Sequence, residues 1–303
     1  MPKNFPASGP VKLHTLMADN VSTKSLKSGA IRSDLVSFDF DEEQELVHNS
    51  FKPMVREGRF DWGELAIVTF LQAKYYGKPL VLLPAVIGGR FQHQCIAYNT
   101  DRGTLSPGEL AGKRIGVRSY TQTTGAWVRG ILQNEYGVDP ATVHWVCFED
   151  AHLAEFSDPS NVERAQKGKK LSQMLLDGDL DAAMLGSDMP NDPRLKTVIP
   201  NPKKDALEWY ERRHVIPMNH MAVVSEDLAR QRPDVVRELY RMLLESRDLD
   251  TKPVDGLQMR PFGTEALRPA LETIITYAFQ QKIIGRKMSV DELFDDTTRA
   301  LGN

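Results

Sequence analysis

The chain has 303 residues, 41% of them hydrophobic, and a formal net charge of −3. This length accommodates one large domain or two lobes of ordinary size, and the apolar fraction is that of a globular protein. The slightly acidic balance argues against a nucleic-acid partner, and no stretch approaches the ~20 apolar residues of a membrane span.

Cysteine usage and the start of the chain bear on its compartment. Cys95 and Cys147 are the only cysteines, too few for a disulfide framework or a thiolate metal cluster, and we expect them to remain unpaired. The first ten residues are polar and interrupted by proline, and they lack the apolar core of a secretory signal. Both features predict a cytoplasmic protein.

In the first hundred residues, apolar and β-branched runs alternate with helical patterns. The expected strands cover residues 11–17, 37–40, 79–87 and 94–99. A helical stretch over 41–57 should stop at Gly58, and the run 60–67 passes from a strand into a helix that continues to Tyr76. This alternation predicts an α/β protein with a mostly parallel sheet covered on both faces.

The segment from Gly112 to Gly125 is the most informative part of the sequence. Residues 115–117 have the pattern of a buried strand end, and 119–124 form a hydroxyl-rich turn. The helix expected over 126–136 has one apolar face, made by Trp127, Val128, Ile131, Leu132 and Tyr136. A strand leading into such a helix exposes backbone N–H groups and the positive end of the helix dipole, which suits an anion. Arg118, at the strand end, could grip a carboxylate with two hydrogen bonds.

The last third of the chain begins with an apolar run over 218–224 that should return as a strand. Three helices are expected after it, over 233–247, 267–281 and 290–301. The stretch 251–263 is interrupted by Gly and Pro and is typical of a loop.

A weak internal repeat indicates two related lobes. Met54, Gly58 and Asp61 recur, at the same spacing, as Met174, Gly178 and Asp181. Both copies have the pattern of a helix that ends at glycine and is followed by an acidic residue and a strand. Any helix–strand junction favours Gly and Asp, so the repeat alone is modest support for one αβ unit used twice.

The residues of the hydroxyl-rich turn also carry a family resemblance. Residues 118–125, followed by Trp127, Arg129–Gly130 and 135–139, resemble the 4,5-dihydroxyphthalate decarboxylase family. The likeness continues through 148–156, 174–183 and 217–220, and it extends from about residue 19 to about residue 245. Two stretches depart from the family pattern: 65–70 has fewer hydroxyl groups, and Gln92 stands where many relatives carry Arg.

The resemblance implies a two-lobed, type II periplasmic-binding-protein-like fold, with mostly parallel sheets, helices on both faces and a ligand cleft between the lobes. We expect residues 1–96 and 218–303 to form lobe 1, and residues 97–217 to form lobe 2. In open α/β sheets, ligands bind beyond the carboxyl ends of the strands.

Three ionisable residues are candidates for catalysis. His93, expected inside a strand near the first lobe crossing, and His220, at the second crossing, could each move a proton near neutral pH. The family fold implies that the crossing strands lie side by side and bring the two histidines together. Glu64, expected at a helix start, could polarise a phenolic hydroxyl or bind a metal. The alternatives are a hydrogen-bonded structural histidine and a first-turn glutamate that only stabilises its helix.

The candidate substrate-binding residues are polar side chains near the expected strand ends. Arg118 is the main carboxylate anchor, Arg90 could hold a second carboxylate, and one threonine of the turn should cap the helix. The full set is Asp19, Arg90, Arg118, Tyr120, Thr121, Thr123, Thr124 and Asn219.

Metal and nucleotide signals are weak. His152 and Glu155 could share a helix face, but His-x-x-Glu alone is poor evidence for a metal site. The glycine-rich segments lack the spacing of a phosphate-binding loop. We therefore predict no cofactor and assign no metal ligand, while a divalent metal stays open as an aid to the reaction.

The resemblance implies a decarboxylase that removes CO₂ from an aromatic dicarboxylate such as 4,5-dihydroxyphthalate, giving 3,4-dihydroxybenzoate. The alternative is a solute-binding protein of the same fold that holds a small aromatic or aliphatic carboxylate without chemistry. The expected partner is thus a small-molecule carboxylate rather than a nucleic acid or a membrane, with a homo-oligomer also open.

Overall fold

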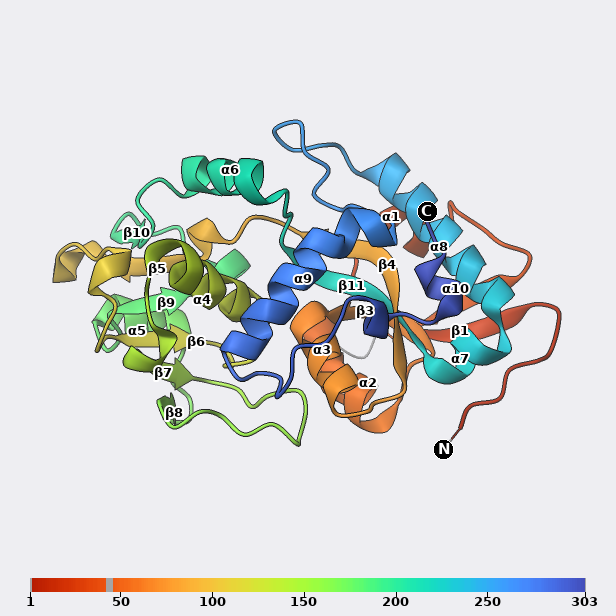
Figure 1. Cartoon of the computed structure of the whole chain (residues 1–303), viewed down its shortest axis with the longest axis horizontal. Helices are drawn as coiled ribbons and strands as arrows, with labels where there is room; N and C mark the ends of the chain where they lie inside the picture. The colour runs from red at the N-terminus through yellow and green to blue at the C-terminus, as the bar shows by residue number, and fades with distance from the viewer. Residues whose placement is uncertain (1, 42–45, 303) are drawn as a thin grey trace. The chain divides into compact units, whose positions relative to one another are not determined.

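The computed structural model describes residues 2–41 and 46–302 and divides the chain into two compact units (Figure 1). Unit 1 comprises Met1–Arg90, Met218–Glu272 and Met288–Asn303, and unit 2 comprises Phe91–Pro217 and Thr273–Lys287. The expected lobes differ at two places, because residues 91–96 and 273–287 belong to unit 2 rather than to the first lobe.

Unit 1 contains a five-stranded sheet in the order β2-β1-β3-β11-β4. Its strands are β1 (Val11–Leu16), β2 (Val36–Phe40), β3 (Trp62–Ala66), β4 (Leu80–Gly89) and β11 (Met218–Ser225). Strands β2, β1 and β3 are parallel, and β11 runs antiparallel to both β3 and β4. Strand β11 therefore pairs with β4, which ends at Gly89 before the first expected lobe crossing, and not with a strand that contains His93.

The helices of unit 1 lie between or after its strands in the chain. They are α1 (Lys24–Lys27), η1 (Val47–Ser50), α2 (Phe51–Glu57), α3 (Ile67–Tyr75), α7 (Glu226–Gln231), α8 (Pro233–Asp250), η7 (Asp291–Leu293) and α10 (Asp296–Arg299). Of these, α3, α7, α8 and α10 contact the sheet. Helix α2 ends at Gly58 as predicted, in a left-handed conformation with φ of 64°. The helix expected over 41–57 begins only at Val47, and its residues 42–45 lie outside the described chain.

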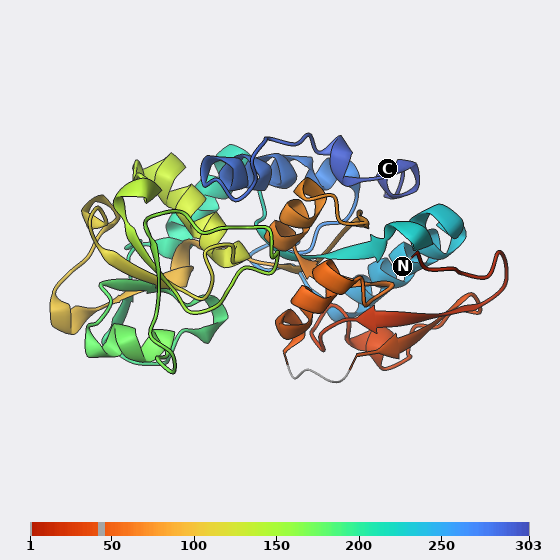
Figure 2. The ribbon, with the colours of Figure 1, turned by 90° about the horizontal axis from the view of Figure 1, so that it is seen from below.

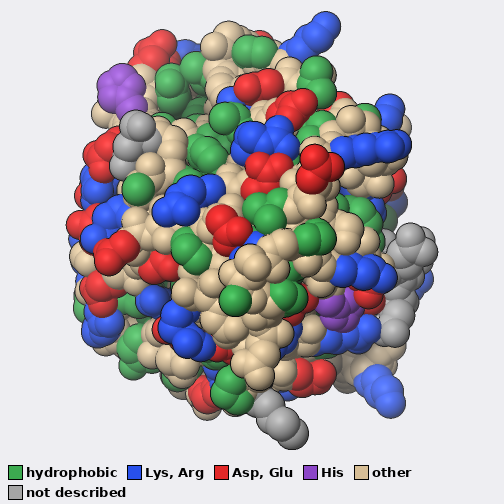
Figure 3. All heavy atoms as spheres, turned by 90° about the vertical axis from the view of Figure 1, so that its right-hand side faces the viewer, with side chains coloured by type: hydrophobic (Ala, Val, Ile, Leu, Met, Phe, Trp, Pro, Cys, Tyr) green, Lys and Arg blue, Asp and Glu red, His purple; other side chains and the backbone are tan. Residues whose placement is uncertain are grey.

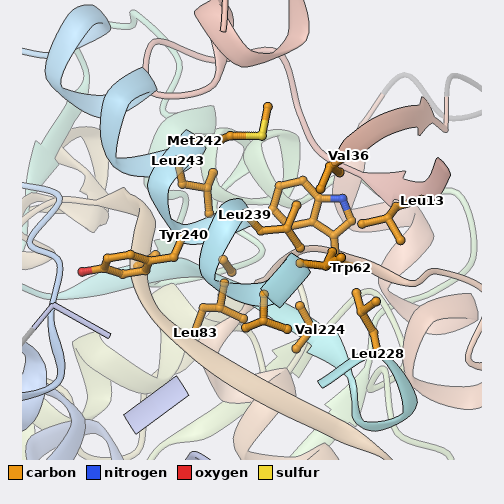
Figure 4. Packing of buried hydrophobic residues seen from close by; sticks show 14 of the residues in the cluster. Leu13, Val36, Trp62, Leu83, Val224, Leu228, Leu239, Tyr240, Met242 and Leu243 are labelled. Atoms are coloured by element: carbon orange, nitrogen blue, oxygen red, sulfur yellow. The ribbon is translucent and has the colours of Figure 1, made fainter. Parts of the chain in front are cut away.

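One core cluster joins the sheet of unit 1 to α8 (Figure 4). Leu239 and Leu243 of α8, one turn apart, pack with Leu13 and Val36 around Trp62, which is 1% exposed. The indole N–H of Trp62 donates to Thr15 Oγ1 at 2.8 Å, so its one polar atom is satisfied. Burial of each such aliphatic side chain contributes about 1.5–3 kcal/mol.

Unit 2 contains a six-stranded sheet in the order β10-β5-β9-β6-β7-β8. Its strands are β5 (Ile96–Asn99), β6 (Arg114–Val117), β7 (His144–Cys147), β8 (Val162–Arg164), β9 (Ala182–Met184) and β10 (Leu195–Thr197). Its longer helices are α4 (Thr123–Tyr136), α5 (Leu171–Asp177) and α6 (Pro202–Arg213). The strand expected over 94–99 starts only at Ile96, because His93–Cys95 forms a short 3₁₀ helix, η2.

Helix α9 (Thr264–Gln280) contains a unit boundary, between Glu272 and Thr273, and the chain returns to unit 1 at Met288. Its end and the residues after it contact unit 2 side chains: Gln281, for example, bonds with Arg129 at 2.7 Å. The helix expected over 290–301 is split into η7 and α10. Residues 2 and 302, next to the chain ends marked in Figure 2, both belong to unit 1.

The internal repeat corresponds to the same pair of hydrogen bonds, between an aspartate and the backbone of a neighbouring strand, in both units. In unit 1, the Asp61 carboxylate accepts from the N–H of His14 at 2.8 Å, and Asp61 N–H donates to His14 O at 2.9 Å. In unit 2, Asp181 makes both bonds to Arg114, at 2.8 and 2.9 Å. The strand that follows each aspartate is parallel to the strand to which the aspartate is hydrogen-bonded: β3 pairs with β1, and β9 pairs with β6. The predicted αβ unit is therefore present twice.

The surface charges and the helices bear on a nucleic-acid or membrane partner. On the face shown in Figure 3, basic and acidic side chains are interspersed and no broad area of one sign stands out. Throughout the described residues, no helix combines the length and the apolarity needed to cross a bilayer.

Candidate active site

A carboxylate–imidazole pair lies on two neighbouring inner strands of the unit 1 sheet. Glu64 of β3 and His220 of β11 are diagonal neighbours in an antiparallel ladder in which Glu64 pairs with Ala222 and His220 with Ala66. The Glu64 carboxylate bonds His220 Nδ1 at 2.6 Å, and its other oxygen accepts from the Ala18 N–H at 2.5 Å. The geometry fixes the imidazole and leaves its Nε2 for another partner.

The two members of this pair differ sharply in exposure. The Glu64 side chain is 1% exposed, whereas that of His220 is 29% exposed. The ring of Phe51 meets the imidazole edge-on at 5.2 Å between centroids. The pairing of β11 with β4 shifts register on both sides of His220, a kind of irregularity that often re-aims a side chain at a functional site. His220 is thus the member of the pair that can meet a ligand.

The expectation that Glu64 begins a helix was wrong. Glu64 lies in the middle of β3, and the helix α3 starts three residues later, at Ile67. Glu64 is therefore not a first-turn residue whose carboxylate is stabilised by the dipole of its own helix. Because both carboxylate oxygens have protein partners and the side chain is buried, the geometry favours action through His220 over direct contact with a phenolic hydroxyl.

The hydroxyl-rich turn of unit 2 joins β6 to α4, as predicted. Arg118 follows β6 and is 23% exposed, with its Nε 3.7 Å from a Glu149 carboxylate oxygen. That separation is an ion pair without a hydrogen bond, so the donors of the guanidinium remain available to a ligand carboxylate. Ser119 and the three threonines of the turn (Thr121, Thr123, Thr124) are buried around the first turn of α4.

Two expectations about this turn need correction. The residue that caps α4 is Gln122, without a side-chain capping bond, rather than a threonine, and the helix starts at Thr123 instead of Ala126. Tyr120 is 4% exposed, and its hydroxyl donates to the Gln281 carbonyl at 3.3 Å. The Tyr120 side chain therefore supports the turn from inside unit 2.

His93 occupies a different setting from the one expected. It begins η2 rather than lying in a strand, is 1% exposed, and meets Trp209 edge-on at 5.6 Å between ring centroids. Among the described residues its Nδ1 has no hydrogen-bond partner. Burial lowers the pKa of His93 to about 4, against a smaller opposing effect of Asp205. The ring lines a cavity of about 210 Å³ in unit 2, together with Glu135, Tyr136, Asp205, Glu208, Trp209 and Arg212.

The environment of His93 predicts a pH-dependent stability. An unfolded histidine takes up a proton near its ordinary value of 6.5, whereas folded His93 does so only near its pKa of about 4. The stabilising contribution is complete above about pH 6.5 and is lost as the pH falls toward 4, with an upper size of about 3 kcal/mol. In urea unfolding at pH 7 and pH 5, His93→Phe should lose less stability on acidification than the wild type.

The matched control for this prediction is His144→Phe, the same change at an exposed position of β7. It should keep the acid sensitivity of the wild type. Equal losses in His93→Phe and the wild type would show that the buried imidazole does not titrate as described.

The remaining candidates fall in several places. Asn219 is half-buried on β11 beside His220, Arg90 is half-buried after β4, and Asp19 is exposed after β1. The expected helix face shared by His152 and Glu155 is absent, because both lie outside the helices. His93 belongs to unit 2 and His220 to unit 1, so the expected meeting of the two imidazoles stays a prediction.

The structure bears on the possible metal ligands and on the two cysteines. Within the described chain, no group of three or more His, Cys, Asp or Glu side chains is placed to hold a metal ion. Cys95 and Cys147 are both buried free thiols, as expected, and burial raises the pKa of Cys147 to about 12.

The sequence patterns missed two parts of the site region. One is the Ala18 N–H, which no side-chain pattern can reveal. The other is Arg129, which is fully buried within α4. Its position between Trp127–Val128 and Ile131–Leu132, inside an otherwise apolar run, was the available signal.

Two relatives share extended sequence similarity with the chain. A 4,5-dihydroxyphthalate decarboxylase of Comamonas testosteroni is 30% identical over 231 residues, which cover 69% of this chain and 67% of the relative. A protein of the same name from Pseudomonas putida is 28% identical over 215 residues, covering 66% of this chain and 81% of the relative. No family model matches the chain.

A solved structure confirms the predicted fold. The alkanesulfonate-binding protein SsuA of Xanthomonas axonopodis pv. citri, bound to MOPS, superposes with a TM-score of 0.62 at 12% identity, over 95% of this chain and 99% of that one. The fold is therefore the type II periplasmic-binding-protein-like fold, a likeness that by itself does not distinguish an enzyme from a binding protein. The extended similarity in sequence makes this distinction. It shows that the chain belongs to the 4,5-dihydroxyphthalate decarboxylase family of carboxy-lyases.

Proposed function

We propose that the protein decarboxylates an aromatic dicarboxylate, 4,5-dihydroxyphthalate in the first instance, to 3,4-dihydroxybenzoate and CO₂. The observation that carries the proposal is the Glu64–His220 pair, with a 2.6 Å bond that orients a partly exposed imidazole. A decarboxylation of this kind needs a proton donor, and an imidazole held by a buried carboxylate is suited to that task.

In the proposed reaction, protonated His220 donates its Nε2 proton to the ring carbon that bears the departing carboxylate. A phenolic hydroxyl supplies electron density to the ring and makes this protonation feasible. The bond from the ring to the carboxylate carbon then breaks, its electron pair returns to the ring, and CO₂ leaves. Solvent reprotonates His220. The negative charge of Glu64 stabilises the imidazolium that precedes the transfer.

The carboxylate that stays on the ring is assigned to the β6–α4 turn of unit 2. Arg118 offers a planar set of donors, and the first turn of α4 offers a positive dipole end. Asp19, Arg90 and Asn219 are assigned to secondary contacts with the ring substituents. Holding the spectator carboxylate leaves the other one to be turned out of the ring plane.

The reaction is proposed to need no organic cofactor, with a divalent metal left open as an aid, and the protein is proposed to work in the cytoplasm. The absence of a disulfide between the buried Cys95 and Cys147 is compatible with that compartment. The proposed partner is a small aromatic dicarboxylate. The alternative function is that of a binding protein that holds the same carboxylate without turnover.

The test is CO₂ release and ultraviolet spectra from purified protein with 4,5-dihydroxyphthalate, before and after treatment with EDTA. Turnover with 4,5-dihydroxyphthalate is the expected result. Turnover that survives EDTA would identify a metal-free decarboxylase, and turnover that is lost on chelation and restored by a divalent ion would identify a metal-assisted one. Tight binding without CO₂ under either condition would favour the binding protein, and no binding at all would point to another acid.

A further inference from the structure

Arg129 is a fully buried arginine behind the β6–α4 turn. Its Nε donates to Gln281 Oε1 at 2.7 Å, and its Nη2 donates to the Tyr120 carbonyl. The guanidinium carbon lies 4.2 Å from the centroid of the Tyr120 ring and 5.2 Å from that of Trp145. All of these contacting groups are neutral.

No carboxylate balances this charge. Among the described residues Arg129 forms no ion pair, and its Nη1 has no hydrogen-bond partner. Asp158, an acid that influences it electrostatically, is paired instead with Arg164. Buried charges are normally paired because desolvation is costly, so a buried cation without a counter-ion is an exception that calls for a cause.

The position of the guanidinium suggests that cause. A Cβ atom placed on Gly125, in the first turn of α4, would lie 3.1 Å from Arg129 Nη1, so the cation is close behind the helix start. Its bond to the Tyr120 carbonyl also fixes the backbone between Arg118 and the helix. The buried cation therefore adds a fixed positive charge to the end of α4 that already favours anions.

We propose that Arg129 is a positioning residue for a carboxylate bound at the β6–α4 turn, with its counter-ion supplied by the ligand. This inference rests on the proposed function for the identity of the ligand as an aromatic dicarboxylate. Arg118 meets the carboxylate directly, whereas Arg129 acts from behind the turn through its charge and through the Tyr120 carbonyl.

The sharpest test adds a counter-ion without removing the arginine. Gln281→Glu keeps the size of the side chain and its acceptor for Arg129 Nε, at the cost of the Gln281 bond to the Ala126 carbonyl. Gln280→Glu, the same change at the exposed neighbouring residue, is the matched control. We expect Gln281→Glu to weaken binding of phthalate, measured by calorimetry, by about tenfold or more, and Gln280→Glu to change it less than about twofold.

Arg129→Lys and Arg129→Met separate charge from structure if Gln281→Glu does not fold. Lysine should retain most of the phthalate affinity because it keeps the positive charge, and methionine should lose it because it supplies neither the charge nor a donor for the Tyr120 carbonyl. Gln281→Glu that folds and binds phthalate as the wild type does, or equal affinities in the lysine and methionine variants, would overturn the proposal. So would a wild type that binds neither phthalate nor benzoate.

Phthalate lacks the phenolic hydroxyls that the reaction uses, so its binding is a readout separate from catalysis. A protein that releases no CO₂ but loses phthalate affinity in Gln281→Glu would refute the decarboxylase and uphold the role of Arg129. A wild type that releases CO₂, combined with unchanged phthalate affinity in Gln281→Glu, would uphold the decarboxylase and refute the role of Arg129.

Discussion

Replacing His220 by glutamine should lower kcat for 4,5-dihydroxyphthalate by about 10²–10⁴-fold, while the dissociation constant of phthalate changes little. Glutamine keeps a polar side chain next to Glu64 but cannot deliver a proton. The loss should therefore appear in kcat rather than in binding. Steady-state CO₂ release combined with calorimetric binding of phthalate measures the two quantities separately.

The control for this change is His14→Gln, the same substitution on β1 of the same unit, at a half-buried position away from the Glu64–His220 pair. It should leave kcat near the wild-type value. His93→Phe should also retain most activity if the buried His93 has a structural role. The reverse pattern, with His220→Gln active and His93→Phe inactive, would transfer the proton donor to His93.

Gly63→Ala should destabilise the folded protein by several kcal/mol, on the order of 3–5. The φ angle of Gly63 is 154°, and an added Cβ would lie 2.1 Å from the carbonyl oxygen of Leu16. Leu16 is the residue of β1 that pairs with Gly63, so β1 and β3 would have to separate. That shift would also move the Ala18 N–H away from Glu64. Urea unfolding monitored by tryptophan fluorescence measures the loss.

Gly88→Ala, on strand β4 of the same sheet, is the matched control. The nearest atoms to its added Cβ are 3.9 Å away, which is ordinary van der Waals contact. Its free energy of unfolding should stay within about 1 kcal/mol of the wild type. A Gly63→Ala protein that unfolds at the same urea concentration as Gly88→Ala would show that β1 and β3 tolerate the extra carbon.

The sequence was a good guide to the sheets because their signal is local. Strands β1, β2 and β4 appear as apolar, β-branched runs, and Gly58 marks the end of α2 by its preference for a left-handed conformation. The unit to which 273–287 belongs depends instead on contacts such as the one between Gln281 and Arg129, which are far apart in the chain. Contacts of that kind leave no periodic pattern in one sequence.

The site was predictable in composition but less so in geometry. His220, Arg118 and the hydroxyl-rich turn could be named from their types and from their positions at strand ends. Glu64 was assigned to a helix because the apolar run after it is helical, although β3 continues through Ala66 before that helix starts. The two departures from the family pattern are also clearer in three dimensions: residues 65–70 and Gln92 are all buried.

The matching hydrogen bonds of Asp61 and Asp181 define equivalent positions in the two units, and these positions hold different residue types. Because Asp61 and Asp181 align the two halves, Glu64 of β3 corresponds to Met184 of β9, each three residues beyond its aspartate. Likewise Ala18, four residues after His14, corresponds to Arg118, four residues after Arg114. The same αβ unit thus carries an acid in one copy and a cation in the other. The bonds that align each copy involve neither residue, so substitutions at these two positions could specialise each copy without disturbing the scaffold.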